Sequence, residues 1–178
     1  MTDNLDNSAL RVVVGLRLGA PLVLPHHQCA CGATVNRLGH HGLACKRSAG
    51  RHLRHNLLND TILRALQSAN VAAIREPPGL TRTDAKRPDG ATLVPWTRGR
   101  CLLWDATCPD TLAPSYIQRS AVESGAAAAL AETKKRAKYS TLAIAHEFVP
   151  VAIETLGTWG SEGLAFIKEV GKLTAIIV

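Results

Sequence analysis

The sequence is poor in aromatic residues and contains no long uninterrupted hydrophobic run. Phe, Trp and Tyr make up only 4% of the 178 residues, so a core must be built mainly from Leu, Ile, Val and Ala. The apolar stretch at residues 12–25 is interrupted by Arg17, glycine and proline, and no basic segment precedes it. No run reaches the roughly 18 apolar residues that cross a bilayer. We therefore expect neither a membrane span nor a signal peptide. Residues 1–25 are expected to pack on the main domain.

Acidic residues are also in deficit. The chain has 21 Lys and Arg against 14 Asp and Glu, which gives a formal net charge of +7 and a pI near 9.5. A positive balance favours a polyanionic partner, nucleic acid first, and nothing in the sequence indicates a small-molecule ligand. The hydrophobic content of 46% is sufficient for a folded core and argues against extensive disorder.

Three of the five cysteines crowd into residues 29–45, beside histidines. Thiolate and imidazole are good zinc ligands, and four of them complete a tetrahedral site. Residues 26–49 lack apolar material for a core of their own, so metal binding would supply the folding energy. We predict a zinc module whose ligands are Cys29, Cys31, His41 and Cys45.

The choice of histidine depends on spacing. His40 is an alternative to His41, but the H-x3-C step from His41 to Cys45 spans one helical turn, which brings both side chains to one side. The other explanation is three unrelated reduced cysteines in a loop.

The rest of the chain, residues 50–178, alternates between helical and β patterns. Hydrophobic periodicity and turn residues predict elements in the order helix, three strands, helix, strand and helix. Their expected ranges are 50–69, 71–76, 91–96, 100–107, 117–145 with a break at Gly125, 147–155 and 160–173. This order predicts an α/β domain with a small mixed sheet flanked by helices. The apolar end "KLTAIIV" looks truncated.

Two aspartates stand beside predicted neighbouring strands. Asp89 precedes the strand at 91–96, and Asp105 directly follows the apolar run "LLW" in the next strand. A charge placed after a buried run is costly unless it is paired or bound to metal. A hairpin can bring the two carboxylates together as ligands of a divalent metal. Alternatively, each caps a turn or pairs with Arg87 or Arg100.

Several motifs together resemble a known family. "RPDG", then "LLWDATCPDT", then "KRAKY" resemble the restriction-enzyme-like endonuclease domain of site-specific non-LTR retrotransposons, which belongs to the PD-(D/E)xK nuclease superfamily. A Cys-Cys-His-Cys knuckle precedes that domain, as the Cys/His cluster does here. The pair Arg54-His55 is similar to an arginine-histidine pair that opens a helix in that family. The resemblance spans roughly residues 25–160, and the chain looks like the carboxyl-terminal part of a reverse-transcriptase-like polyprotein.

The resemblance implies a Mg²⁺ site. Asp89 and Asp105 resemble the two acidic ligands, and the backbone carbonyl of Ala106 would face the same metal. Glu76 is either an accessory acid or the partner of an arginine.

The resemblance also implies a catalytic lysine, but the sequence departs from the superfamily pattern. Thr107 occupies the place where the superfamily has a lysine. The lysine would then come from the following helix, as Lys135 or Lys138, with Tyr139 beside it. The run also looks like a nuclear-localisation signal, which we discount because this helix is expected to pack on the sheet.

The implied function is a Mg²⁺-dependent DNA endonuclease of a mobile element, located inside the cell in the nucleus. DNA, or the RNA of the element, would be held through phosphate contacts by Lys46, Arg47, Arg51 and Arg54. A catalytically decayed, non-enzymatic nucleic-acid-binding remnant is the main alternative. A purely structural zinc-stabilised interaction domain is the third.

Overall fold

The computed structural model describes residues 6–23, 25–80 and 86–177. The chain forms two compact units, Met1–His52 and Leu53–Val178. The helix α3 (Ala49–Ser68) begins in the last residues of the first unit and runs into the second.

The first unit consists of short elements. Helix α1 (Asn7–Leu18) begins at Asp6, whose side chain accepts a hydrogen bond from the backbone N–H of Ala9 at 2.7 Å. It ends at Gly19, whose φ of 65° is the left-handed conformation that glycine adopts readily. The elements that follow are β1 (His27–Gln28), β2 (Thr34–Val35) and α2 (His41–Ala44). The sequence did not predict α1, and the packing of residues 1–25 on the main domain stays a prediction.

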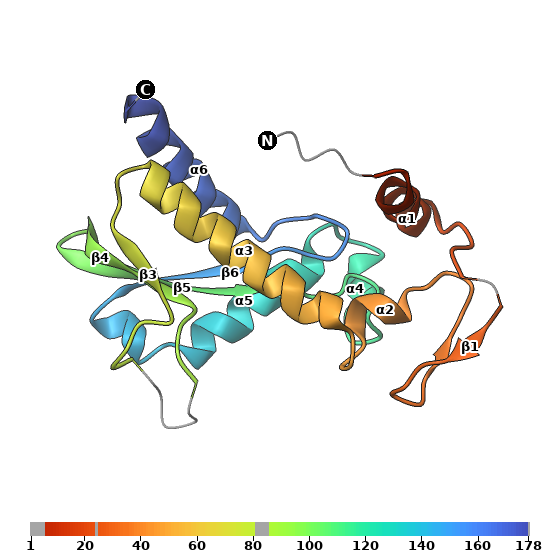
Figure 1. Ribbon diagram of the computed structural model, residues 1–178. Coiled ribbons are helices and arrows are strands. Elements are labelled where there is room, and N and C mark those ends of the chain that lie inside the picture. The colour runs from red at the N-terminus through yellow and green to blue at the C-terminus, as the bar shows by residue number, and fades with distance from the viewer. Residues whose placement is uncertain (1–5, 24, 81–85, 178) are drawn as a thin grey trace. The chain divides into compact units, whose positions relative to one another are not determined.

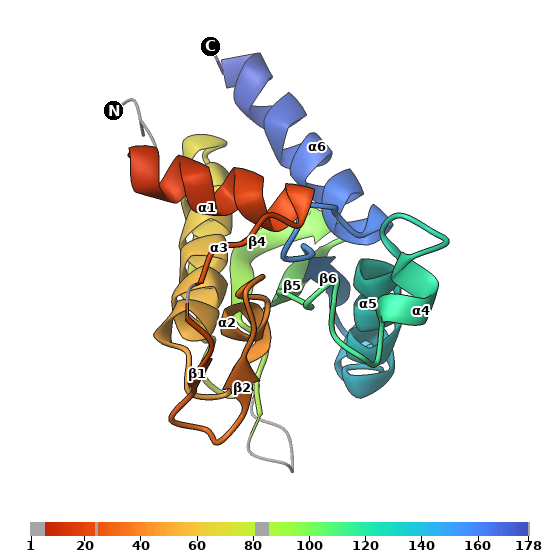
Figure 2. The ribbon, with the colours of Figure 1, turned by 90° about the vertical axis from the view of Figure 1, so that its right-hand side faces the viewer.

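The second unit contains a four-stranded sheet flanked by helices (Figures 1 and 2). After α3 its elements are β3 (Ala73–Arg75), β4 (Gly90–Thr97), β5 (Arg100–Thr107), α4 (Ile117–Ser120), α5 (Ala126–Lys138), the 3₁₀ turn η1 (Leu142–Ile144), β6 (Glu147–Ala152) and α6 (Ser161–Ile177). The strand order is β3-β4-β5-β6, with β3, β4 and β5 antiparallel and β6 parallel to β5. This confirms the predicted α/β class with a small mixed sheet.

Alternation along β5 divides its side chains between two faces. Leu102 and Trp104 pack against Ile62 and Leu66 of α3 and Phe166 of α6. Figure 1 shows α3 and α6 lying beside each other. On the opposite face, Leu103 packs with Tyr139, at the end of α5, and with Phe148. β5 is therefore an inner strand, covered on both faces.

Most predicted elements are confirmed, some with shifted ends. The helix at 50–69 and the strands at 91–96 and 100–107 correspond within one residue to α3, β4 and β5. The strands predicted at 71–76 and 147–155 are shorter, because β3 begins only after the turn that follows α3 and β6 ends before a turn at 155–156. Pro95 lies where β4 extends beyond its pairing with β3, which is the edge position expected for it.

The single helix predicted over 117–145 is wrong in extent. It divides into α4, α5 and η1, and the predicted break at Gly125 is confirmed by its φ of 86°. α5 ends at Lys138 because the next residue, Tyr139, turns into the core, where it is fully buried.

Gly90 is required by the packing of Trp104. A Cβ at residue 90 would overlap the Trp104 ring, which is fully buried. Gly90→Ala should therefore lower the free energy of unfolding by roughly 1–3 kcal/mol, measured by urea denaturation. Gly171→Ala in α6 is the matched control, because its Cβ would meet nothing and alanine favours the helix by roughly 0.5–1 kcal/mol. Equal stability of Gly90→Ala and the wild type would contradict this packing.

Candidate metal centre and carboxylate site

The four predicted zinc ligands come together in the first unit. Their ligand atoms all lie within 4.8 Å of one another. Cys29 Sγ is 3.7 Å from Cys45 Sγ, and Cys31 Sγ is 3.2 Å from His41 Nε2. Zn–S bonds of about 2.3 Å at tetrahedral angles place two sulfur ligands about 3.8 Å apart. This cluster can hold a metal such as zinc.

Short local hydrogen bonds create the cluster. The N–H of Cys29 donates to the carbonyl of Ala33, and a φ of 90° at Gly32 lets the chain turn tightly between them. His41 opens α2, and the N–H of Cys45 donates to its carbonyl at 2.9 Å, so H-x3-C spans one turn as predicted. His41 rather than His40 belongs to the group.

The thiol of Cys31 is suited to metal binding. The pKa of Cys31 is lowered to about 7, mainly by a hydrogen bond from the backbone N–H of Ala33 and further by hydrogen bonds with the other cluster side chains, although desolvation opposes this. The thiolate, which is the form that binds metal, is therefore well populated near neutral pH.

The second unit holds a carboxylate–lysine site on the face covered by α5. The side chain of Asp105, in β5, is only 4% exposed. Lys135 Nζ lies 2.5 Å from its Oδ1, and Lys138 Nζ lies 3.6 Å from its Oδ2. Burial raises the pKa of Asp105 and the charge of Asp89 adds to this, while the Lys135 ammonium opposes both. The charge of Asp105 therefore depends on a nearby cation.

Asp89 directly precedes β4 and is held on several sides. Its Oδ2 accepts hydrogen bonds from the N–H of Ala106 at 2.7 Å and from His55 Nε2 at 3.0 Å. Its backbone N–H donates to the carbonyl of Trp104, and its own carbonyl accepts from the N–H of Glu76. Burial acts to raise the pKa of Asp89, but the hydrogen bond and charge of His55 outweigh it and the pKa is lowered. The same hydrogen bond raises the pKa of His55.

The carbonyl of Ala106 lies on the same side as the Asp89 carboxylate. The N–H and C=O of one strand residue point toward the same neighbouring strand, and the N–H of Ala106 reaches Asp89. The charge of Asp89 also acts on Asp105, since it raises the pKa of Asp105. Asp89 therefore interacts with two successive residues near the end of β5, Asp105 through its charge and Ala106 through a hydrogen bond.

Tyr139 and Glu76 both contact Arg87, two residues before Asp89. Tyr139 is fully buried, its hydroxyl donates to the carbonyl of Arg87 at 2.8 Å, and Lys138 Nζ donates to that hydroxyl at 2.7 Å. The Glu76 carboxylate forms an ion pair with Arg87. Of the two alternatives for Glu76, accessory acid or partner of an arginine, the structure therefore shows the second. Both contacts hold the chain just before Asp89.

The remaining predicted phosphate-binding residues are divided between the two units. Lys46, Arg47 and Arg51 belong to the first unit and Arg54 to the second. Arg47 donates to the carbonyl of Ala30 at 2.5 Å and so braces the Cys/His module. Thr107 ends β5. His55 was noted in the sequence only as part of an arginine–histidine pair, and its contact with Asp89 was not predicted.

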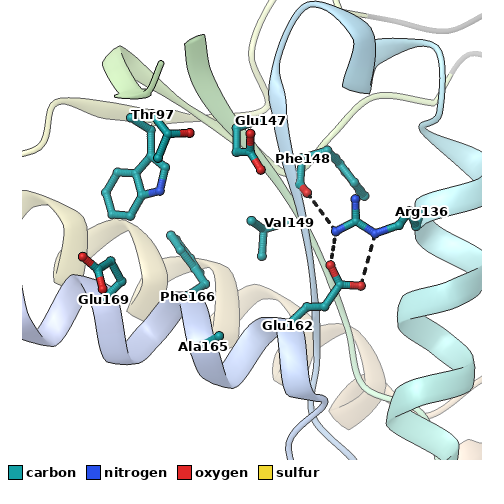
Figure 3. A pocket seen from close by; sticks show the side chains of 10 residues that line it. Thr97, Arg136, Glu147, Phe148, Val149, Glu162, Ala165, Phe166 and Glu169 are labelled. Atoms are coloured by element: carbon teal, nitrogen blue, oxygen red, sulfur yellow. Dashed lines mark hydrogen bonds and ion pairs between the residues drawn. The ribbon is translucent and has the colours of Figure 1, made fainter. Parts of the chain in front are cut away.

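A cavity of about 270 Å³ lies at the other end of the parallel strand pair (Figure 3). Glu147, in its wall, pairs with Leu102 near the start of β5, whereas Asp105 lies near the end of that strand. Its three glutamates are matched by basic partners, in the pairs Glu147–Arg100, Glu162–Arg136 and Glu169–Lys172. This cavity is separate from the carboxylate–lysine site.

Across residues 6–23, 25–80 and 86–177, the Cys/His cluster is the only group of three or more His, Cys, Asp or Glu side chains placed to share a metal. In the same ranges, no helix is both long and apolar enough to cross a membrane. No protein-family model matches the chain, and no curated protein matches it as a relative.

The cluster predicts about one zinc ion per chain. Cys45→Ser should lose most of this zinc on dialysis, because one of four ligands is removed. Cys101→Ser is the matched control, since Cys101 is a cysteine of β5 outside the cluster. The measurement is elemental analysis of the dialysed proteins. Equal zinc content in the two variants would refute the site.

Proposed function

We propose that the second unit is a divalent-metal-dependent DNA endonuclease of the restriction-enzyme-like type, which hydrolyses a phosphodiester and nicks DNA. The observation that carries the proposal is the Lys135–Asp105 ion pair near the end of β5, where the next residue, Ala106, donates its N–H to the Asp89 carboxylate. Support also comes from the small mixed sheet, in which one acid precedes β4 and the other lies in the adjacent β5. Asp89 and Asp105 are the two acids that the sequence resemblance implies as metal ligands.

The residues at this end of β5 fit a hard divalent cation. Mg²⁺ prefers oxygen ligands and is commonly bound by one or two carboxylates together with water. Asp89, Asp105 and the carbonyl of Ala106 would hold it. When bound, Mg²⁺ would lower the pKa of an attached water and offset charge on the phosphate. A cation there would also relieve the repulsion by which Asp89 raises the pKa of Asp105.

Lys135 is the better candidate for the catalytic lysine. Its ammonium reaches the buried Asp105 at 2.5 Å, whereas Lys138 lies at 3.6 Å and donates to the Tyr139 hydroxyl. An ammonium beside the metal ligands can orient the attacking water or offset charge in the transition state. Tyr139, being buried, would act by holding the backbone before Asp89 rather than by touching DNA.

A second candidate is the non-catalytic nucleic-acid-binding remnant. The observation that favours it is that lysines already lie near both oxygens of Asp105. A carboxylate whose charge is balanced in this way is stable without metal. The remaining function would then be nucleic-acid binding, through phosphate contacts by Lys46, Arg47, Arg51 and Arg54.

Asp105→Asn and Asp89→Asn should each reduce Mg²⁺-dependent nicking of a supercoiled plasmid by roughly a hundredfold or more. DNA affinity, measured by fluorescence anisotropy, should stay nearly unchanged, because carboxylates make no attractive contact with phosphate without a metal. Glu123→Gln, at an exposed position, is the control and should nick like the wild type. Undiminished nicking by Asp105→Asn would contradict the mechanism. A wild type that binds DNA but never nicks would favour the remnant.

The two lysines should differ when each is replaced by alanine. Lys135→Ala should lose nicking, while Lys138→Ala should retain most of it, because only Lys135 makes a close contact with Asp105. The pair are each other's matched controls, being one turn apart on α5. Single-turnover nicking at saturating Mg²⁺ is the measurement, with urea unfolding to check that both variants fold. If Lys138→Ala loses nicking and Lys135→Ala retains it, the catalytic lysine is Lys138.

A further inference from the structure

One contact to Asp89 comes from a helix rather than from the sheet. His55, on α3, places Nε2 3.0 Å from Asp89 Oδ2. An ionised carboxylate can only accept hydrogen bonds, so Nε2 carries the proton and donates it. The Asp89 side chain is 18% exposed and that of His55 is 38% exposed, so the contact lies at the border of the core.

His55 is braced from within the core by Asn59, one turn later on α3. Asn59 is fully buried, and its Nδ2 donates to the His55 carbonyl at 3.2 Å. The indole Nε1 of Trp104 donates to Asn59 Oδ1 at 2.9 Å. Because an indole N–H is a donor only, it fixes which end of the Asn59 amide faces His55.

The hydrogen bonds form a closed circuit. Trp104 anchors Asn59, Asn59 braces His55, His55 holds Asp89, and the N–H of Asp89 donates to the Trp104 carbonyl at 3.0 Å. Trp104 is also the residue directly before Asp105. The circuit therefore fixes Asp89 relative to the strand that carries the second acid.

Both hydrogen bonds to the Asp89 carboxylate reach the same oxygen. Oδ2 accepts from His55 and from the N–H of Ala106. In the part of the chain that the structure describes, Oδ1 receives no hydrogen bond. Two donors on Oδ2 restrict rotation of the carboxylate and leave Oδ1 for a ligand.

We propose that His55 is a positioning residue, which holds the Asp89 carboxylate by Oδ2 so that Oδ1 is presented to the divalent metal. The proposal rests on the proposed function, because it requires that Asp89 is a metal ligand. Partners that orient metal ligands typically contribute a factor of 10–100 to metal affinity.

The test is calorimetric titration of Mg²⁺ alone into the zinc-loaded full chain. His55→Ala should weaken Mg²⁺ binding by roughly 10–100-fold. His55→Phe keeps a ring but has no N–H, and it should be equally weak. His55→Gln should recover much of the affinity, because its amide can donate to Oδ2. His52→Ala is the matched control, since this exposed histidine lies one turn earlier on α3, and its affinity should be unchanged.

Nicking at varied Mg²⁺ gives the second readout. For His55→Ala the Mg²⁺ concentration for half-maximal nicking should rise, while the rate at saturating Mg²⁺ should stay near that of the wild type. Wild-type Mg²⁺ affinity in folded His55→Ala and His55→Phe would overturn the positioning role and leave the endonuclease intact. If His55→Gln binds as weakly as His55→Ala, a hydrogen bond donated to Oδ2 is not what His55 contributes, and the proposal is wrong. If the wild type neither binds Mg²⁺ nor nicks DNA, the proposed endonuclease function is refuted. The positioning role of His55 is then refuted as well, because it depends on that function.

Discussion

The ion pair between Asp105 and Lys135 is the interaction on which the second unit depends. Asp105 lies in an inner strand, with a side chain only 4% exposed, and a charge in such a place is costly unless a partner meets it. The partner lies 30 residues later on α5, so this helix must cover that face of the sheet. Small side chains permit the close approach, since Ala128 and Ala131 pack against Ala152 of β6. The same packing of α5 on the sheet thus places Lys135 beside Asp105.

Two buried glutamates fix the helices around this pair. Glu154 accepts a hydrogen bond from the N–H of Ala128 in the first turn of α5, and Glu132 accepts from Gly163 at 2.9 Å in the first turn of α6. A carboxylate at a helix N-terminus satisfies unpaired N–H groups and is favoured by the helix dipole. Burial raises the pKa of Glu132, and the N–H of Gly163 opposes that rise. With its N-terminal end held in this way, α5 presents Lys135 and Lys138 at a defined rotation.

Local patterns in the sequence were sufficient for much of the fold and for the Cys/His cluster. The bounds of β5 follow from one apolar run, and the cluster follows from a spacing within 17 residues, Cys29 to Cys45. Contacts between distant segments were not predictable in this way. The choice between Lys135 and Lys138 depends on the rotation of α5, which Glu154 helps to set from beyond that helix. The contact of His55 with Asp89 joins residues 34 apart and leaves no periodic signal. Helix α1 was missed because its valine run is equally typical of buried extended chain.

The central claim is that Asp89 and Asp105 hold a divalent metal at the end of β5. It is tested most directly by the anomalous signal of Mn²⁺ in a crystal of the zinc-loaded protein. We expect a Mn²⁺ peak bounded by the carboxylates of Asp89 and Asp105 and the carbonyl of Ala106, with Lys135 displaced from Asp105. A crystal saturated with Mn²⁺ that shows no peak there, and keeps the Asp105–Lys135 pair closed, would contradict the claim.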